Sequence, residues 1–185
     1  MSYFRKMVGE RLYLSPIGIN DDDANNYIKW MNDKTVAVDF GQYNHVVASI
    51  SDIKWIYEPP GDMQRYAMVL LDGDVLLGSI SIHNIDHLNG NAFIGIFIGE
   101  EEYRRKGYGA EAIRLIVEYG IKTLNLHTIM LTVHADNYAA VACYKKVGFR
   151  EVGRLPEVVF KDGQYVDKLY MAIVAREFKS KDFAL

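Results

Sequence analysis

Three apolar, β-type segments that follow one another without a helix between them place the strongest limit on the fold. Two of them, within RYAMVLLDGDVLLGSISIHNID, flank Asp72–Gly73. An Asp-Gly pair readily adopts the positive φ angles of a tight hairpin turn. The third segment, NAFIGIFIG, follows the turn-like sequence HLNGN. The pattern predicts an antiparallel meander of three strands.

After Gly107 the spacing of apolar residues changes to that of a helix. The residues with this spacing are Ala110, Ile113, Val117, Ile121 and Leu124. Glu111 and Glu118 each lie at helix-neighbour spacing from Arg114, which predicts a charged opposite face. A strand, HTIMLTVHA, follows, and then a helix within NYAAVACYKKVGF. We expect this second helix to begin with Asn137 as its cap and to end at Gly148.

The remaining segments complete a mixed α/β pattern. ERLYLSPI reads as a first strand that Pro16 ends, and helices are expected in DANNYIKWMND, after Asp21–Asp23, and in SISDIKWIYE. FREVGRL and EVVFKDGQYVDKLYMAIVAREF read as strands, with a second Asp-Gly turn at Asp162–Gly163. The order predicts a mixed sheet that is antiparallel early and holds one strand–helix–strand unit. Because no linker divides the chain, we expect a single domain over residues 1–185.

Composition excludes several classes of protein. Half of the 185 residues are hydrophobic, as in a globular protein, and the formal net charge of −3 disfavours a nucleic-acid partner. No segment has the length of a signal peptide or a membrane span, so we expect a cytoplasmic protein without a membrane partner. The one cysteine, Cys143, forms no internal disulfide, and the five histidines show no metal-binding spacing. We therefore expect no metal.

The segment EEEYRRKGYGA joins the third strand of the meander to the first of these helices. Gly107 and Gly109 allow the backbone to approach a ligand closely, and the first amides of the helix have no partner inside it. Arg104, Arg105 and Lys106 add positive charge, so the segment suits a phosphate group. A solvated loop whose glycines only turn the chain is the simpler alternative.

Two other phosphate-binding loops fit this segment less well. Gly107-x-Gly109-x-x-Ala112 imitates a dinucleotide-binding turn, but that turn follows its strand directly and belongs to a series of strand–helix units. Here charged and aromatic residues intervene after an antiparallel meander. A Walker-type loop is excluded because no Gly-Lys-Ser/Thr sequence follows.

Two motifs resemble signatures of the GCN5-related N-acetyltransferase (GNAT) superfamily. Arg104-x-x-Gly107-x-Gly109 resembles the pyrophosphate motif Gln/Arg-x-x-Gly-x-Gly/Ala. One helix and one strand later, NYAAVACYKKVGF resembles the pattern Asn-x-x-Ala-x-x-x-Tyr-x-x-x-Gly-Phe. The likeness is good over the C-terminal two-thirds of the chain. The opening GERLYLSPI and the closing GRLPEVVFKDGQYVDKLYMAI are similar to the ribosomal-protein N-terminal acetyltransferase branch.

The resemblance implies a GNAT fold, with a mostly antiparallel sheet that splays in the middle, and transfer of acetyl from acetyl-CoA to an amine. It also implies a set of cofactor-binding residues. The backbone of Phe97, Ile98 and Gly99 would hold the pantetheine and the acetyl group. The pyrophosphate would lie against Arg104, Arg105, Lys106, Gly107, Tyr108, Gly109 and Ala110. Asn137 would contact the cofactor, and Tyr144 would reach the sulfur as a general acid.

The chemistry of a phenol suits the role implied for Tyr144. With an ordinary pKa near 10, a phenol stays protonated at neutral pH and can donate to a departing thiolate. A backbone N–H of the splayed strand can stabilise the developing oxyanion. Each residue also has a simpler interpretation: Tyr144 as a partly buried aromatic, Asn137 as an N-cap and Cys143 as a small core residue.

The base that deprotonates the amine is open. Many relatives have a glutamate early in the fourth strand, where this chain has Phe93. Glu100 follows the strand and is the candidate that would act through water, although it also reads as a solvated loop charge. His134 is a minor candidate, and loss of the proton to solvent needs no side chain.

The acceptor is open as well. The branch resemblance favours an N-terminal α-amine of a protein or peptide. The acidic clusters Asp21–Asp23 and Glu100–Glu102 favour a polyamine or another small cationic amine. A CoA-binding module without catalysis is a third alternative, which Tyr144 disfavours. The oligomeric state is open, with a homodimer as one possibility.

Overall fold

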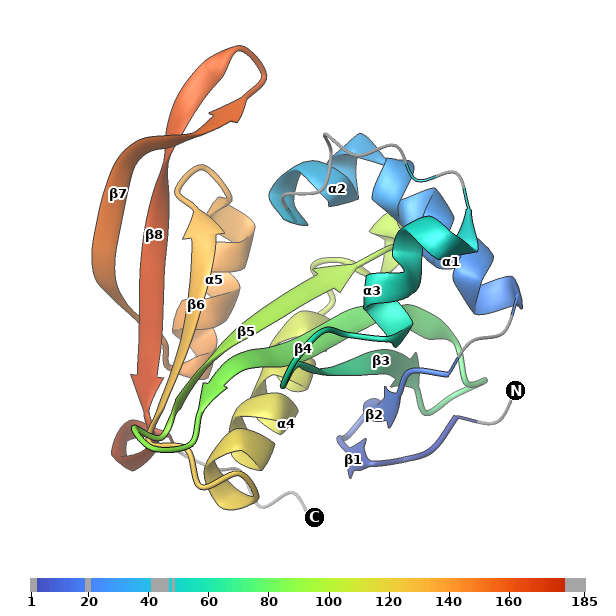
Figure 1. Ribbon diagram of the computed structural model, residues 1–185, viewed down its shortest axis with the longest axis horizontal. Helices are drawn as coiled ribbons and strands as arrows, with labels where there is room; N and C mark the ends of the chain where they lie inside the picture. Colours follow the sequence, from blue (N-terminus) through green and yellow to red (C-terminus); the bar gives the residue numbers. More distant parts are fainter. Residues whose placement is uncertain (1–2, 19–20, 41–46, 48, 179–185) are drawn as a thin grey trace.

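The computed structural model describes residues 3–18, 21–40, 47 and 49–178. One eight-stranded sheet has the strand order β1-β2-β3-β4-β5-β6-β8-β7 (Figure 1). The strands are β1 (Met7–Val8), β2 (Leu12–Pro16), β3 (Gln64–Leu70), β4 (Leu76–Asp86), β5 (Asn91–Ile98), β6 (Thr128–His134), β7 (Arg150–Lys161) and β8 (Gln164–Val174). The helices are α1 (Asp21–Asn32), α2 (Lys34–Phe40), α3 (Lys54–Tyr57), α4 (Tyr108–Lys122) and α5 (Tyr138–Val147). Single turns of 3₁₀-helix occur at η1 (Ile50–Ile53), η2 (Glu101–Tyr103) and η3 (Ala175–Glu177).

The predicted antiparallel meander is confirmed. β3 pairs with β4, and β4 pairs with β5, both antiparallel. The turn at Asp72–Gly73 is looser than a two-residue hairpin, because the N–H of Leu70 donates to the carbonyl of Val75 at 2.9 Å. The positive φ angles accordingly fall on Gly73, at 76°, and Asp74, at 50°.

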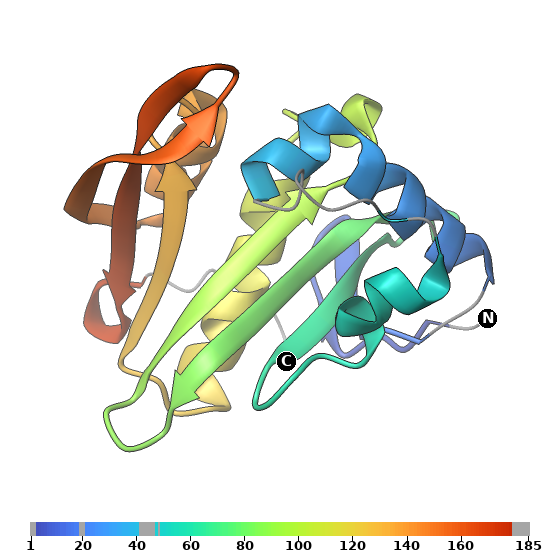
Figure 2. The same ribbon diagram turned by 45° about the horizontal axis from the view of Figure 1, so that its top comes forward.

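The sheet splays where β5 and β6 part. These two strands pair in parallel only from Asn91 opposite Thr128 to Phe93 opposite Met130. β6 then follows β8 as far as His134, and β5 runs away from both in Figures 1 and 2. The main-chain groups of β5 beyond Phe93 on this side therefore pair with none of the described strands. This is the mixed, mostly antiparallel, splayed sheet that we expected.

Helices cover both faces of the sheet. α4 and α5 pack on one face, against apolar side chains such as Leu14, Ile80, Ile94 and Leu131. α1 and α3 lie on the other face, where Trp30 and Ile56 pack with Tyr13, Val69 and Phe97. Within the described ranges, no helix is long and apolar enough to cross a membrane.

Two elements were not predicted. α2 was missed because its sequence, KTVAVDF, is rich in β-branched residues. Asp33 stabilises its start, since its Oδ1 accepts the N–H of Thr35 at 2.8 Å and its carbonyl accepts from Val36 and Ala37. β1 is only two residues long, too short for a pattern to show. The helix expected in residues 49–58 is divided into η1 and α3.

Candidate active site

The glycine loop ends at the first turn of α4. Gly107 precedes this helix with a φ of 89°, a conformation that glycine adopts without strain. The N–H of Glu111 donates to the carbonyl of Gly107 at 3.1 Å as the first bond of the helix. The preceding N–H groups, of Tyr108, Gly109 and Ala110, have no partner inside the helix and point out of its start. Together with the positive end of the helix dipole, they form a binding site for an anion such as phosphate.

Arg11, which sequence reasoning missed, holds this loop in place. Its Nη1 donates to the carbonyl of Lys106 at 2.9 Å, and its Cζ lies 4.7 Å from the ring centroid of Tyr108. Its Nε donates to Glu111 Oε2 at 3.0 Å. A Cβ on Gly107 would lie 3.2 Å from Arg11 Nη2, so the glycine also lets the guanidinium approach. Arg11 therefore connects the β1–β2 turn to both sides of the anion site.

Glu111 was expected on a charged outer face of α4, and that prediction is wrong. The residue is only 6% exposed, and its Oε1 accepts the N–H groups of Arg11 at 2.7 Å and Leu12 at 3.2 Å. A Cβ on Gly9 would lie 2.5 Å from the same oxygen. Glu118 is likewise buried, and it bonds to Lys122. Helical periodicity could not reveal this, because the β1–β2 segment that covers Glu111 lies 100 residues away.

The three cations of the loop have different surroundings. The guanidinium of Arg104 turns back into the protein and donates to the carbonyls of Ile98 at 3.2 Å and Gly99 at 2.8 Å. Its Nη1 also donates to Thr35 Oγ1 at 3.1 Å, which links the end of β5 to α2. Arg105 and Lys106 are exposed, and neither forms an ion pair with another described residue. Their side chains are thus available to an anion, whereas that of Arg104 is already bonded.

The end of β5 packs against α1. Phe97, 7% exposed, makes edge contacts with Tyr27 and Trp30 at centroid distances of 6.2 and 6.1 Å. Gly99 donates its N–H to the carbonyl of Leu77 at 2.8 Å, and a Cβ there would collide with the ring of Trp30. The side chain of Phe97 and both main-chain groups of Gly99 are therefore occupied within the protein.

Ile98 faces the other way, toward the glycine loop. A Cβ on Gly109 would lie 3.7 Å from Ile98 Cδ1 and 3.8 Å from Cys143 Sγ. Burial raises the pKa of the Cys143 thiol, which keeps it protonated at neutral pH. Three elements, β5, α4 and α5, thus converge at Gly109, and the thiol is a packing residue as expected.

α5 carries the second predicted group of site residues. Asn137 caps the helix, as predicted, because its Oδ1 accepts the N–H of Ala140 at 3.1 Å. Gly148 ends the helix with a φ of 119°, also as predicted. Tyr144 is 8% exposed, and its ring meets that of Phe149 edge-on at 6.1 Å. Its phenol is thus held by packing on the side of the sheet that α4 and α5 cover.

Glu100 lies just beyond β5 and is bound by α1. Its Oε1 accepts from Lys29 Nζ at 2.6 Å and from Trp30 Nε1 at 2.9 Å. The bond from Lys29 is the main cause of a lowered pKa for the Glu100 carboxyl, and the Trp30 bond adds to it. The group is therefore an ionised, well-oriented carboxylate of low basicity.

Two histidines lie on the strands beside the splay. His134 ends β6 and is 8% exposed. His83 on β4 stacks on Phe93 at 6.3 Å, and its Nδ1 is 3.5 Å from Ser81 Oγ. Burial lowers the pKa of His83, and the nearby charge of Arg65 lowers it further. In the part of the chain that the structure describes, no three metal-ligating side chains come together.

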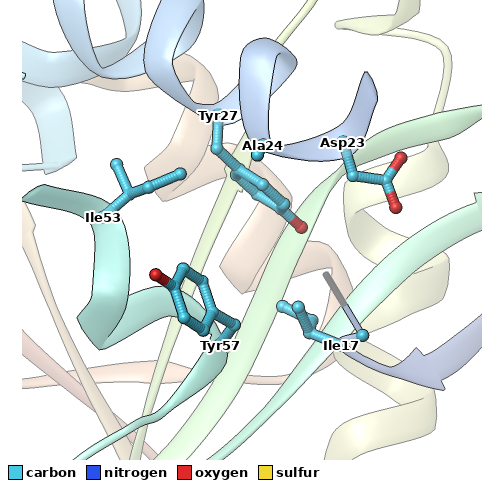
Figure 3. A pocket seen from close by; sticks show the side chains of 7 residues that line it. Ile17, Asp23, Ala24, Tyr27, Ile53 and Tyr57 are labelled. Atoms are coloured by element: carbon cyan, nitrogen blue, oxygen red, sulfur yellow. The ribbon is translucent and has the colours of Figure 1, made fainter. Parts of the chain in front are cut away.

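A small hollow lies between α1 and α3, beside the end of β2 (Figure 3). It is lined by Ile17, Gly18, Asp23, Ala24, Tyr27, Ile53 and Tyr57. The hydroxyl of Tyr27 has no hydrogen-bond partner among the described residues, whereas Asp23 accepts the phenol of Tyr3 at 2.7 Å. The hollow has room for about one water molecule, so it is too small for an amine acceptor.

The glycine loop has the features that a diphosphate-binding site requires. Three amides converge at the start of α4, and Gly107 and Gly109 bring no side chain that would block a ligand from reaching them. Arg105 and Lys106 supply exposed positive charge next to these amides. The edge of β5 beyond Phe93, where β6 no longer pairs with it, leaves main-chain groups that an extended ligand can bond with.

Comparison with known proteins identifies the family of the chain. Residues 11–150 match the family model of the acetyltransferase (GNAT) domain. The uncharacterized N-acetyltransferase p20 of Bacillus licheniformis is 26% identical over 176 residues, 91% of this chain and 96% of the relative. Over 115 residues, 62% of this chain, two other relatives are 30% and 32% identical. They are the putative ribosomal N-acetyltransferase YdaF of Bacillus subtilis, covered to 62%, and the spermidine N(1)-acetyltransferase of Escherichia coli, covered to 61%.

Solved structures share the fold. The spermidine N-acetyltransferase of Vibrio cholerae, in complex with CoA and spermine, superposes with a TM-score of 0.77 at 24% identity. This superposition covers 90% of this chain and 96% of that one. Mycobacterium smegmatis RimJ, in complex with CoA-disulfide, gives a TM-score of 0.74 at 24% identity, with 94% and 90% covered. The match of residues 11–150 to the family model, the relatives named N-acetyltransferases and the shared fold show that the chain belongs to the GNAT family and is an acetyl-CoA-dependent N-acetyltransferase.

Proposed function

We propose that the acceptor is the N-terminal α-amine of a protein or peptide. The observation that carries this proposal is the lack of carboxylates on the strands that face the acceptor. In β3, β4 and β5, Asp86 is the sole acidic residue; it ends β4 and is bonded to Asn89. A polyamine carries several positive charges, each of which needs an anionic or polar partner when it leaves water. At its reacting end a peptide carries one positive charge, that of its amine, and its backbone groups are neutral.

The acceptor side of the site lies on the face of β3–β5 that α1 and α3 flank. β5 is unpaired there beyond Phe93, so an acceptor on this face can reach a thioester held along the edge of β5. Glu100 does not offer a free negative charge to a polyamine, because Lys29 already neutralises it. This pairing supports the peptide acceptor as well.

Different parts of the chain bind the cofactor, stabilise the developing charge and position the amine. Bound acetyl-CoA supplies an acetyl thioester. The amides of Tyr108, Gly109 and Ala110 hold the diphosphate and fix the cofactor along β5. A backbone N–H on the unpaired edge of β5 is placed to stabilise negative charge on the thioester oxygen as the amine attacks. Holding the amine beside the thioester supplies much of the acceleration.

Two protons move during the reaction, and each has a proposed carrier. The attacking amine forms the new C–N bond while the C–S bond breaks. Tyr144 holds the proton that the departing sulfur takes up. The proton lost by the amine passes through water toward Glu100. Since the pKa of Glu100 is lowered, this carboxylate is a weak base, and we assign it a smaller share of the rate than Tyr144.

A second acceptor class is supported by the relatives. The E. coli relative at 32% identity is named a spermidine acetyltransferase, so a polyamine is the alternative acceptor. The discriminating assay measures thiol release from acetyl-CoA with unblocked peptides, N-terminally blocked lysine peptides and spermidine. We expect a higher kcat/KM for unblocked peptides, with acetyl on the α-amine by mass spectrometry. Turnover of spermidine without turnover of any peptide would replace this proposal with the alternative.

A further inference from the structure

A row of aligned residues crosses three strands on the acceptor side of the sheet. Arg65 on β3 lies opposite Ser81 on β4, and Ser81 lies opposite Gly95 on β5. Adjacent strands are about 4.8 Å apart, so the row spans roughly 10 Å from β3 to β5. The missing side chain at Gly95 leaves space beside Ser81 Oγ and His83 Cε1, which would lie 3.4 and 3.7 Å from a Cβ there.

Arg65 is a buried cation with no anionic partner in the part of the chain that the structure describes. The residue is 8% exposed, and its Nε has no hydrogen-bond partner among the described residues. Nη1 reaches Ser79 Oγ only at 3.5 Å, and Nη2 reaches the thioether of Met63 at 3.2 Å. A hydroxyl at that distance and a thioether are weak acceptors for a guanidinium, which has five N–H donors.

The remaining contact of Arg65 covers one face of its guanidinium. Its Cζ lies 4.9 Å from the ring centroid of Trp55 on α3. A cation–π contact leaves the N–H groups in the guanidinium plane unused. Burial lowers the pKa of Arg65 to about 10, so the group is still charged at neutral pH. A buried charge of this kind is costly unless it is paired and hydrogen-bonded.

The position of Arg65 connects it to the acceptor. On the acceptor side of the sheet, Arg65 lies next to the buried residues Ser79 and Ser81. Beyond them lie His83 and Gly95, which are partly exposed. Its bond to Ser79 directs the guanidinium toward β4, about one strand spacing from β5. The thioester is expected along the unpaired edge of β5. A group bound by Arg65 would thus belong to the same molecule as the attacking amine.

We propose that Arg65, with Ser79 and Ser81, is a specificity site that binds a carboxylate of the acceptor, placed within a few bonds of the amine that is acetylated. The inference rests on the proposed function only in requiring that the acceptor enter on this face. A carboxylate can accept two parallel N–H bonds from a guanidinium. It would therefore provide acceptors for the N–H groups of Arg65 that no described residue accepts. The serine hydroxyls supply further donors to the same oxygens.

The same site disfavours a polyamine. A second cation near Arg65 would be repelled, since no carboxylate of β3 or β5 is present to offset it. The chemistry that fits is an amine with a nearby carboxylate, which a peptide with an acidic second residue and a free α-amino acid both have. The carboxylate near the amine is the group that both molecules share. Assaying an acidic peptide and a free amino acid separately shows which of the two supplies it.

The experiment measures kcat/KM for matched acceptors that differ only in acid or amide. One pair is an unblocked peptide that begins alanyl-aspartyl and its alanyl-asparaginyl counterpart. The other pair is alanine and alaninamide. Hydrogen bonds to a charged group are worth about tenfold or more in binding, so we expect at least one acid to exceed its amide by about that factor. The pair that shows the preference identifies the source of the carboxylate.

Variants assign the preference to Arg65. Arg65→Met keeps an unbranched apolar stem and removes the guanidinium and its charge, and it should bring the acid-to-amide ratio close to one. Arg65→Lys keeps the charge without the planar fork and should retain part of the ratio. Arg176→Met, at an exposed arginine of η3, is the matched control and should leave the ratio unchanged. An unchanged affinity for CoA in all three shows that the fold is intact.

The outcomes separate this inference from the proposed function. Equal kcat/KM for acids and amides in the wild type, or an unchanged ratio in Arg65→Met, would overturn the role of Arg65. Acetylation of peptides without an acid preference would leave the proposed function standing. If no amine is acetylated, the proposed function fails. In that case, calorimetry on the CoA complex measures the Kd of each acid and of its amide. The ratio of these two Kd values, in the wild type and in Arg65→Met, then decides the role of Arg65.

Discussion

Replacing Glu111 by alanine should destabilise the protein strongly, although the residue lies at the edge of the cofactor site. Its carboxylate accepts the N–H groups of Arg11 and Leu12 and bonds Arg11 Nε. Each N–H that loses its acceptor costs about 1–3 kcal/mol, and two N–H groups are affected. The ion pair adds less than a fully buried pair would, because the Arg11 side chain is half-exposed. We therefore expect the Glu111→Ala variant to lose about 4 kcal/mol of unfolding free energy.

Urea denaturation measures this loss directly. For a chain of 185 residues, 1 kcal/mol corresponds to about 2–4 °C in Tm, so the melting temperature should fall by about 10 °C. The urea midpoint should fall while the m-value stays constant. Glu101→Ala, at an exposed acid of the same loop, is the matched control and should change the stability by less than about 0.5 kcal/mol.

Two further variants separate stability from loop geometry. Glu111→Gln keeps an acceptor oxygen and should lose only about half as much stability as Glu111→Ala. Arg11→Met leaves both backbone N–H groups bonded to Glu111 but removes the cation that pairs with this buried carboxylate, so it should lose some stability, though less than Glu111→Ala. It should also weaken CoA binding, because the carbonyl of Lys106 loses its anchor. A loss below about 1 kcal/mol in Glu111→Ala would refute the view that this carboxylate organises the β1–β2 turn.

Three other predictions follow from the site. Tyr144→Phe should lower kcat by about 10²-fold or more with an unchanged Kd for CoA, and an unchanged kcat would remove Tyr144 as the acid. Gly107→Ala should weaken CoA binding measured by calorimetry, because its φ of 89° and the nearby Arg11 guanidinium oppose a Cβ, whereas equal affinity would show that the loop tolerates one. Glu100→Gln should lower kcat less than Tyr144→Phe does. The pKa of Glu100 is lower in the folded state, so the ionised carboxylate stabilises the wild type relative to Glu100→Gln at neutral pH. In urea titrations this difference in unfolding free energy should be lost as the pH falls below about 4.3. A difference that grows in acid would contradict the lowered pKa.

Local signals in the sequence predicted the parts of the fold that local forces determine. The two Asp-Gly turns lie between the expected strands, at 72–73 and 162–163, and Asn137 and Gly148 bound α5 as predicted. These features depend on backbone preferences within a few residues of each other. The splay of the sheet was predicted only from the family resemblance, because no local pattern shows where two strands stop pairing.

Contacts between distant segments could not be read from the sequence. Arg104 was expected to face the pyrophosphate, yet its guanidinium bonds to the carbonyls of Ile98 and Gly99. Arg11 and Arg65 carry no motif, and their importance follows only from what the fold places around them. A charged residue in an amphipathic pattern is therefore weak evidence of exposure when another segment covers that face.

A crystal structure of the protein with a non-hydrolysable acetyl-CoA analogue tests the central claim most directly. We predict diphosphate oxygens within hydrogen-bond distance of the amides of Tyr108, Gly109 and Ala110, and the phenol of Tyr144 directed at the thioester sulfur position. A diphosphate bound away from the start of α4, or a Tyr144 phenol turned away from the sulfur, would contradict the account.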